Sequence, residues 1–189
     1  MTATPPRLWL VRHGATEWSE KGRHTGSTDV PLLPRGADAA RALAVRLADY
    51  DFALVLTSPR QRARETARLA GYPDAGVDDD LHEWDYGTYE GLTSDEIRAQ
   101  RPGWTIWNGD PPGGETAAQV ETRARAVIQR AATAPGDVLL FAHGHILRVL
   151  TAVYLGFGAR AGAQFALDTT TINVLGHEHD DPTLRRWNT

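Results

Sequence analysis

The stretch Leu8-Trp9-Leu10-Val11-Arg12-His13-Gly14-Ala15-Thr16 decides the fold of this chain. Its first five residues, Leu8–Arg12, predict a short buried strand, and His13-Gly14 predicts a sharp turn where that strand ends. In open α/β sheets, ligands bind at the carboxyl ends of the strands. A histidine between an arginine and a glycine at such a position is therefore a candidate functional residue.

Two more apolar runs of strand length end in turns with polar side chains. Residues 52–56 (Phe-Ala-Leu-Val-Leu) precede Thr57-Ser58-Pro59, and Val138–Ala142 precedes His143-Gly144-His145. Such continuous apolar runs are typical of parallel strands buried on both faces. Because the strands alternate with helical patterns, we expect an α/β fold, a three-layer α/β/α sandwich with a mostly parallel sheet. The carboxyl ends of parallel strands lie at one edge, so the three turns can converge on one site.

The remaining elements follow from local signals. Thr93 and Glu96 form a capping box that opens a short helix, and Ser58 as N-cap with Pro59 at the first helical position opens an earlier one. Residues 172–175 predict an antiparallel edge strand, and the polar residues after it predict no element. We expect one domain, 1–189, with helices at 34–49, 59–70, 93–100, 116–132 and 146–154, a short strand at 77–81, and loops at 16–34, 83–91 and 102–114.

Composition narrows the class of protein. The formal net charge of −4 gives no overall basic field, so neither nucleic acid nor an anionic membrane is the expected partner. The chain has no cysteine, which excludes disulfides, thiol catalysis and thiolate metal sites. Residues 1–6 show no signal-peptide pattern, and no apolar run approaches the length of a membrane span. We expect a cytoplasmic enzyme or binding protein that holds anions with local arginines.

His13 suits nucleophilic attack on phosphorus. A neutral imidazole is a covalent nucleophile when one ring nitrogen is unprotonated, which requires the other to donate its proton to a fixed acceptor. Arg12 presents a planar fork of donors that matches two phosphoryl oxygens. The next predicted helix adds Arg60, Arg62 and Arg64 near an N-terminus that itself attracts anions. Spacing alone does not choose among these three, and the alternative interpretation is a core histidine with solvated arginines.

Glu83 is a candidate general acid. It lies in Leu81-His82-Glu83-Trp84-Asp85-Tyr86-Gly87, and an apolar setting beside aromatic rings favours the protonated form of a carboxyl group. Glutamates in loops are more often exposed to solvent, and Asp85 competes for the same role.

The His143-Gly144-His145 turn offers a second histidine. Gly144 suits a tight turn at which the backbone comes close to a ligand. His143 and His145 point in opposite directions on an extended segment, so they do not readily bind one ion. No third ligand cluster supports zinc. We therefore expect no metal site.

Four segments carry a family pattern in their order along the chain: Leu10-Val11-Arg12-His13-Gly14-Ala15-Thr16, Thr57-Ser58-Pro59-Arg60-Gln61-Arg62-Ala63-Arg64-Glu65-Thr66-Ala67, Glu83-Trp84-Asp85-Tyr86-Gly87 and Phe141-Ala142-His143-Gly144-His145. Together they resemble the histidine phosphatase superfamily, the phosphoglycerate-mutase-like group, on its acid phosphatase and sugar-phosphate phosphatase side. Residues 22–32 and 113–116 resemble further family segments. The resemblance covers residues 8 to 150.

The resemblance implies catalytic roles. His13 would be phosphorylated in the intermediate, and Arg12, Arg62 and His143 would form a positive pocket around the phosphoryl oxygens. Glu83 would donate the proton to the leaving oxygen and later take one from the attacking water. The register of the family pattern selects Arg62 over its neighbours and Glu83 over Asp85.

Further positions would contact substrate. At Ser19 the family often has an asparagine that contacts phosphate, and the shorter serine reaches less far. Thr25 and Gly26 match positions that border the substrate in mutases of the family. We add Tyr86 as a wall of the substrate site, with loop packing as the alternative, and Gly144 as a close backbone contact.

The implied chemistry needs no metal and no cofactor. Phosphoryl transfer is mostly positioning and neutralisation of oxygen charge. Two arginines and a protonated His143 would supply the charge that magnesium supplies in kinases. A neutral nucleophile together with a protonated acid predicts activity on the acidic to neutral side of the pH range.

We expect a phosphatase that hydrolyses phosphomonoesters of small metabolites such as sugar phosphates. The alternatives are a cofactor-dependent phosphoglycerate mutase, a phosphohistidine protein phosphatase and a non-catalytic module that binds phosphorylated ligands. Mutases of the family hold their bisphosphate intermediate under a longer insertion, whereas here only residues 84–142 separate the acid from the second histidine. We interpret residues 102–114 as a lid, in which Trp104 and Trp107 either face substrate or pack the loop.

Overall fold

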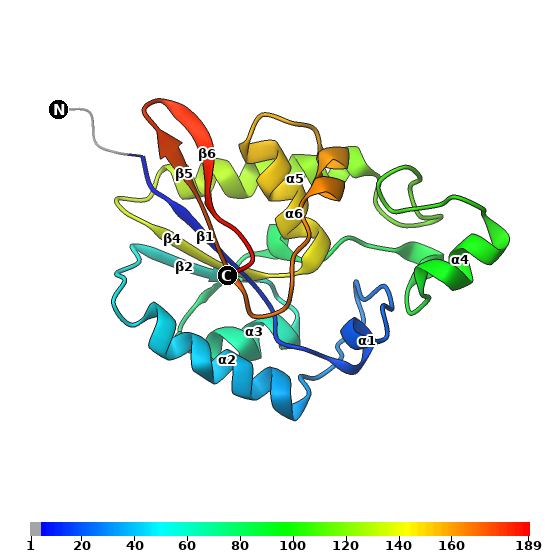
Figure 1. Ribbon diagram of the computed structural model, residues 1–189, viewed down its shortest axis with the longest axis horizontal. Coiled ribbons are helices and arrows are strands. Elements are labelled where there is room, and N and C mark those ends of the chain that lie inside the picture. The colour runs from blue at the N-terminus through cyan, green and yellow to red at the C-terminus, as the bar shows by residue number, and fades with distance from the viewer. Residues whose placement is uncertain (1–4) are drawn as a thin grey trace.

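A six-stranded sheet forms the centre of the computed structural model, which describes residues 5–189 (Figure 1). The prediction about a signal peptide in residues 1–6 therefore lies mostly outside the described residues. The strands are β1 (Leu8–Arg12), β2 (Leu54–Thr57), β3 (Gly76–Val77), β4 (Val138–Ala142), β5 (Ile172–Glu178) and β6 (Asp181–Arg186). The helices are α1 (Glu17–Glu20), α2 (Pro34–Leu47), α3 (Gln61–Leu69), α4 (Ser94–Gln100), α5 (Ala117–Ala132) and α6 (Gly144–Tyr154). Short 3₁₀ helices lie at Asp79–Leu81, Gly87–Tyr89 and Ala159–Gln164.

The sheet has the order β3-β2-β4-β1-β5-β6. Strands β3, β2, β4 and β1 are parallel, and β5 and β6 are antiparallel to their neighbours. Helices α2 and α3 cover one face and α5 and α6 cover the other, so the expected three-layer α/β/α architecture with a mostly parallel sheet is confirmed (Figure 1).

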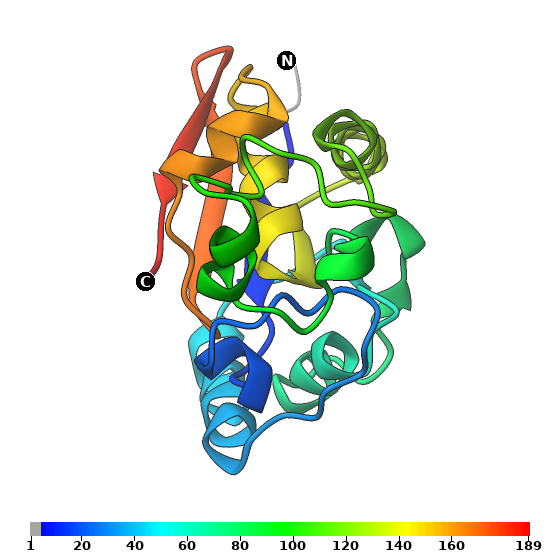
Figure 2. The ribbon, with the colours of Figure 1, turned by 90° about the vertical axis from the view of Figure 1, so that its right-hand side faces the viewer.

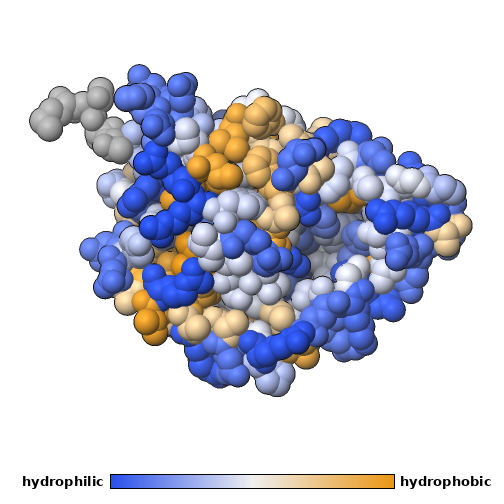
Figure 3. All heavy atoms as spheres, viewed as in Figure 1, coloured by the Kyte–Doolittle hydropathy of each residue, from blue (hydrophilic) through white to orange (hydrophobic). Residues whose placement is uncertain are grey.

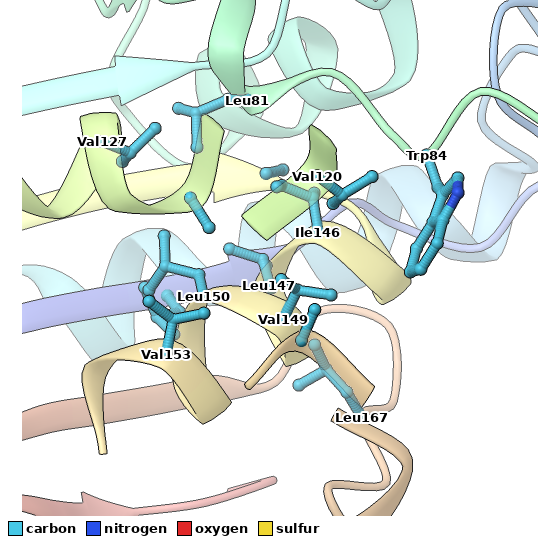
Figure 4. Close-up of a cluster of buried hydrophobic side chains, with 14 of the residues drawn as sticks. Leu81, Trp84, Val120, Val127, Ile146, Leu147, Val149, Leu150, Val153 and Leu167 are labelled. Carbon is cyan, nitrogen blue, oxygen red and sulfur yellow. The ribbon is translucent and has the colours of Figure 1, made fainter. Parts of the chain in front are cut away.

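Side chains of β1 alternate between two cores. Leu8 and Leu10 pack in the cluster formed with α5 and α6, which Figure 4 shows around Val120, Val127, Leu147 and Leu150. Trp9 and Val11 pack in the opposite cluster with residues of α2 and α3. A strand that is buried on both faces needs apolar residues at every position, which explains the continuous run in the sequence.

Three predicted features differ from the structure. Residues 77–81 do not form a strand, because only Gly76–Val77 pairs and Asp79–Leu81 is a 3₁₀ helix capped by Asp78. Strand β5 is not at the edge, because β6 extends the sheet beyond it through a hairpin. Helix α3 begins at Gln61 with Arg60 at its N-cap, so the assignment of Ser58 as N-cap is wrong.

No helix within residues 5–189 is both long and apolar enough to cross a lipid bilayer.

The register of the sheet sets three turns side by side. Arg12 of β1 pairs with Ala142 of β4, and Thr57 of β2 pairs with Phe141 of β4. His13 N–H donates to the Ala142 carbonyl at 2.9 Å, and Ser58 N–H donates to the Phe141 carbonyl at 2.9 Å. The residues that follow the three strands therefore meet at one edge. Figure 2 looks from this side of the molecule, with α1 (dark blue) and the green segments around α4 in front of the sheet.

Candidate active site

His13 is held as a neutral imidazole with one free nitrogen. Its Nδ1 donates to the Gly14 carbonyl at 2.8 Å, because a carbonyl oxygen only accepts. The proton is therefore on Nδ1, and Nε2 makes no hydrogen bond with residues 5–189. Burial and the positive charges of Arg62 and Arg12 hold the pKa of His13 well below its usual value. The result is an unprotonated nitrogen beside two guanidinium groups.

The turn after β1 is fixed by its neighbours. Gly14 N–H donates to Thr66 Oγ1 at 3.0 Å, and Thr66 belongs to α3. A Cβ on Gly14 would lie 2.5 Å from the Gly36 carbonyl oxygen of α2, so only glycine fits between the strand end and that helix. These contacts give the His13 ring a rigid support.

Arg12 lies beside His13 at the wall of the pocket. Its Nη1 donates to the Leu167 carbonyl at 2.6 Å, and its buried Nε has no hydrogen-bond partner among the described residues. Burial lowers the pKa of Arg12 from its usual value, which lies so high that the guanidinium stays charged. Arg12 is thus a fixed positive charge with N–H groups that remain available to an anion.

Arg62, which the family register selects among the three candidate arginines, is completely buried. Its Nη1 donates to the Thr28 carbonyl at 3.0 Å, and its Nη2 donates to the Thr25 carbonyl at 2.7 Å. Its Nε donates to His143 Nδ1 at 3.1 Å. These bonds hold the guanidinium close enough to His13 for its charge to act on that ring, although Arg62 does not line the pocket.

His143 is neutral in this structure, so the prediction of a protonated His143 is wrong. Its Nδ1 accepts from Arg62 and therefore has no proton. Its Nε2 lies 2.6 Å from Ser58 Oγ, which explains why Ser58 does not cap α3. Burial and the charge of Arg62 hold the pKa of His143 well below its usual value. The His13 and His143 rings meet edge to face with centroids 5.2 Å apart.

Glu83 lies at the opposite side of the pocket and is 5% exposed. Its Oε1 accepts from the backbone N–H groups of Trp84 and Ile146, and its Oε2 accepts from that of His145, each at 2.9 Å. His145 and Ile146 belong to the first turn of α6, where a helix attracts negative charge. Both oxygens are thus held as acceptors, and Glu83 can donate a proton only after gaining one.

A pocket of about 320 Å³ opens at this edge, and Figure 3 shows the surface hollowed beside the segments around α4. Arg12, His13, Glu83, Tyr86, Ser19, Thr25 and Gly144 line it. Tyr86 is buried and its hydroxyl lies 2.6 Å from His145 Nδ1. Gly144 lies against the Arg12 guanidinium, and a Cβ there would touch it.

Two of the predicted substrate contacts have other partners. Ser19 Oγ donates to the Thr16 carbonyl at 3.0 Å and accepts from Thr16 N–H, so its hydroxyl closes a capping box of α1. Gly26 does not line the pocket, and its N–H donates to both oxygens of Glu90. The segment with Thr25 and Gly26 instead supplies carbonyl groups that hold Arg62.

The two tryptophans of the 102–114 loop differ. Trp104 is buried and donates from Nε1 to the Gly109 carbonyl at 2.7 Å, so it packs the loop. Trp107 lines the pocket, packs its ring 5.2 Å from His145 and carries the Arg148 guanidinium 4.6 Å above its ring. The loop therefore both closes on itself and supplies a pocket wall.

Several pocket residues were not predicted from the sequence. Arg23, His24, Arg98, Arg148 and His145 all line the cavity. Isolated arginines in polar segments normally indicate solvated side chains, so the sequence contains no signal for Arg98 and Arg148. Arg23 and His24 lie within residues 22–32, and His145 lies within Phe141–His145. The resemblance of these two segments to the family is the one signal that pointed toward these residues.

His143 and His145 point away from each other, as their spacing predicts. His143 contacts Ser58 and Arg62, whereas His145 contacts Tyr86. Within residues 5–189, no group of three histidine, aspartate or glutamate side chains could hold a metal ion. The positive groups of this pocket are arginines.

Comparisons with known proteins agree with this geometry. The family described as the histidine phosphatase superfamily (branch 1) matches residues 8–189. The chain is 41% identical to an acid phosphatase of Mycobacterium tuberculosis, covering 92% of this chain and 87% of that protein. It is 35% identical to sedoheptulose 1,7-bisphosphatase of Saccharomyces cerevisiae, covering 85% and 71%. A solved structure of an open reading frame product of Mycobacterium tuberculosis superimposes with a TM-score of 0.91 at 38% identity, covering 97% of each chain.

Proposed function

Because the chain belongs to the histidine phosphatase superfamily, we propose that it is a phosphatase that hydrolyses phosphomonoesters of small metabolites through a phosphohistidine on His13. The relatives that are phosphatases support the reaction class. The observation that carries the mechanism is the His13 ring, which lines the pocket with its Nδ1 proton fixed on the Gly14 carbonyl and with no hydrogen bond from Nε2 to the described residues. The match over residues 8–189 supports one domain.

In the first step, Nε2 of His13 attacks phosphorus and the bond from phosphorus to the leaving oxygen breaks. Arg12 binds phosphoryl oxygens with its free N–H groups, and Arg62 stabilises the added negative charge from behind the ring. Glu83 protonates the leaving oxygen. Part of a phosphomonoester is the monoanion near pH 6, so the substrate can bring this proton to Glu83.

In the second step, water attacks the phosphorus of phospho-His13 and the nitrogen–phosphorus bond breaks. Glu83, now a carboxylate, takes a proton from the water, and phosphate leaves. Preorganised donors of the kind that Arg12 offers contribute on the order of 3 kcal/mol each to stabilisation of the transition state. In this proposal arginines alone balance the phosphoryl charge, so the reaction is independent of metal.

The pocket favours a small substrate over a protein. Its walls come from β1, α4, α6 and the 102–114 loop, and its volume is near the lower limit for small-molecule sites. The segment between Glu83 and His143 is short, and we take the absence of a longer insertion there to favour hydrolysis over a mutase.

The test is an assay of the purified protein with a chelator present, using p-nitrophenyl phosphate, sugar phosphates and 3-phosphoglycerate. We expect phosphate release by the native protein and none by His13→Ala, together with an acid-labile phosphoenzyme in the native protein alone. Release by His13→Ala at the native rate would refute the nucleophile. Rapid isomerisation of 3-phosphoglycerate with little phosphate release would identify a mutase, and turnover of no substrate would favour a binding module.

A further inference from the structure

Three arginines that the proposed mechanism does not use also line the pocket. Arg23 follows α1, Arg98 lies on α4, and Arg148 lies on α6. Ser94 lines the same pocket, and since it is four residues before Arg98, one face of α4 points into the cavity. These side chains come from three separate segments and meet only in the fold.

Each of these guanidinium groups is fixed by a backbone carbonyl. Arg23 Nη1 donates to the Gly91 carbonyl at 2.5 Å, and Arg98 Nε donates to the Trp104 carbonyl at 2.9 Å. Arg148 Nε donates to the Gly162 carbonyl at 3.0 Å, and its guanidinium lies over the Trp107 ring. A neutral carbonyl orients a guanidinium without cancelling its charge, so the remaining N–H groups are preorganised donors.

Carboxylates compensate these charges only weakly. Arg148 forms no ion pair with any of residues 5–189. Arg23 lies 3.3 Å from a Glu96 carboxylate oxygen at the surface, and Arg98 lies 3.5 Å from a carboxylate oxygen of Asp95. Exposed pairs of this kind are worth little. The three positive charges are therefore available to a ligand.

The pocket has more positive charge and more space than one phosphoryl group needs. The charges of Arg12 and Arg62 already act at His13, where the reacting phosphoryl group would bind. The pocket volume of about 320 Å³ corresponds to roughly ten water molecules, well beyond one phosphate. A substrate with a single anionic group would leave Arg23, Arg98 and Arg148 unused.

Neutral polar groups also line the pocket. His24 Nδ1 donates to the Leu92 carbonyl at 2.8 Å, which leaves Nε2 as an acceptor. Burial lowers the pKa of His24 and holds the pKa of His145 well below its usual value, so both rings are neutral. One neutral acceptor together with the ring of Trp107 suits a hydroxylated carbon chain.

We propose that Arg148, with Arg98 and Arg23, binds a second anionic group of the substrate, a carboxylate or a phosphate, joined to the reacting phosphate by a polyhydroxylated carbon chain. This inference rests on the proposed function for the placement of the first phosphate at His13. This second anion site would make the enzyme selective for doubly anionic phosphomonoesters, by which we mean substrates that carry a second anionic group besides the reacting phosphate.

The test compares substrates that differ in the distal group alone. 3-Phosphoglycerate and glycerol 3-phosphate form a short pair, and 6-phosphogluconate and sorbitol 6-phosphate form a long pair. Sorbitol 1,6-bisphosphate replaces the distal carboxylate by a phosphate and so distinguishes the two anions. In at least one pair we expect the kcat/KM of the native protein to be higher for the doubly anionic member. We expect Arg148→Gln to lower the ratio of the two kcat/KM values, doubly anionic member over its partner, about 10- to 100-fold.

Two variants separate recognition from other effects. Arg148→Lys keeps the positive charge but loses the contact with the Gly162 carbonyl. We expect this variant to restore most of the kcat/KM ratio, whereas the ratio would stay as low as in Arg148→Gln if only that contact mattered. Arg46→Gln removes an exposed positive charge of α2 and leaves the ratio unchanged. An equal fall in Arg46→Gln would overturn the inference, because the effect would then reflect net charge.

A binding measurement keeps this inference separate from the proposed function. Calorimetry on His13→Ala with the same pairs gives ratios of Kd without turnover. If native protein hydrolyses p-nitrophenyl phosphate but no pair shows a preference in kcat/KM or Kd, the inference fails and the proposed function stands. If no phosphomonoester is hydrolysed but Kd favours the doubly anionic members and Arg148→Gln removes that preference, the proposed function fails and the anion site stands.

Discussion

Replacing Glu83 by glutamine tests whether this carboxyl group acts as an acid or only caps a helix. Oε1 accepts two backbone N–H groups and Oε2 accepts one, from His145. A glutamine that keeps its carbonyl oxygen at the Oε1 position turns its NH₂ group toward the His145 N–H. Two donors then face each other at a former hydrogen bond of 2.9 Å.

The structural cost follows from that single contact. A buried N–H that loses its acceptor costs about 1–3 kcal/mol, so the free energy of unfolding falls by that amount. Loss of a general acid costs about 10²- to 10⁴-fold in rate. The two effects are separable. The loss of folding stability is the same for every substrate, whereas the loss of rate from the missing general acid depends on the leaving group.

The assay compares two phosphomonoesters with the native protein and with Glu83→Gln. A nitrophenolate leaves without a proton at neutral pH, whereas an alkoxide such as that of glycerol 3-phosphate does not. We expect kcat/KM, which reports formation of phospho-His13 but not its hydrolysis, to fall at least 100-fold for the alkyl ester and much less for the p-nitrophenyl ester. Urea unfolding of both proteins gives the structural cost independently.

Equal losses for both esters would refute the reasoning. Glu83 would then act by holding the first turn of α6, and the proton for the leaving group would have another source. Trp84→Phe provides a control for disturbance of this region, because it keeps the Glu83 carboxylate but removes the hydrogen bond from Trp84 Nε1 to the Glu115 carbonyl and part of a buried ring. That variant should change both esters alike.

Further predictions concern the histidine, the buried arginine and one stabilising ion pair. Because burial beside Arg62 holds the pKa of His13 well below its usual value, we expect its ring to stay neutral, with the proton on Nδ1, from pH 8 to pH 5 in ¹⁵N NMR spectra assigned with His13→Ala; a midpoint near 6.5 would contradict this. Arg62→Met leaves the Thr28 carbonyl and its neighbours without a donor, so the free energy of unfolding should fall by about 2–4 kcal/mol in urea, and an unchanged midpoint would contradict the role of these bonds. Burial opposes ionisation of Glu115, but hydrogen bonds from His82 and Arg123 lower its pKa from 4.5 to about 2. Since the folded pKa is depressed, the contribution of ionised Glu115 to the free energy of unfolding is complete above pH 4.5 and disappears as the pH falls to about 2. Glu115→Gln should lower the free energy of unfolding by about 2–3 kcal/mol at pH 7 and progressively less below pH 4.5. A loss of stability independent of pH would exclude the charge as its cause.

The convergence of the three turns could be predicted because parallel strands have a fixed register. Once residues 8–12 and 138–142 are taken as neighbouring parallel strands, His13 and His143 must follow at the same edge. The choice of Arg62 could not come from spacing, since Arg60 and Arg64 lie on the same helix. The family pattern supplied that choice, and the carbonyl groups of residues 25–28 explain it physically.

Local rules failed where a distant residue competes for the same group. Ser58 has the composition and position of an N-cap, but its hydroxyl meets His143, which is 85 positions away. The neutral state of His143 also depends on a distant residue, because Arg62 donates to its Nδ1. Strand β6 contains Pro182 and is mostly exposed, so its sequence lacks the apolar pattern that would reveal it. Each of these features depends on tertiary contacts that no local pattern encodes.

Burial has opposite consequences for the two kinds of basic residue in this pocket. It lowers the pKa of His13 from 6.5 and of Arg12 from 12.5, and the arginine charges lower that of His13 further. The imidazole therefore loses its charge at neutral pH, whereas the guanidinium keeps it because its pKa begins so high. A lysine in place of either arginine would be vulnerable to the same loss of charge on burial. A neutral imidazole in a permanent positive field thus follows from placing histidine and arginine, rather than lysine, at one buried edge of the sheet.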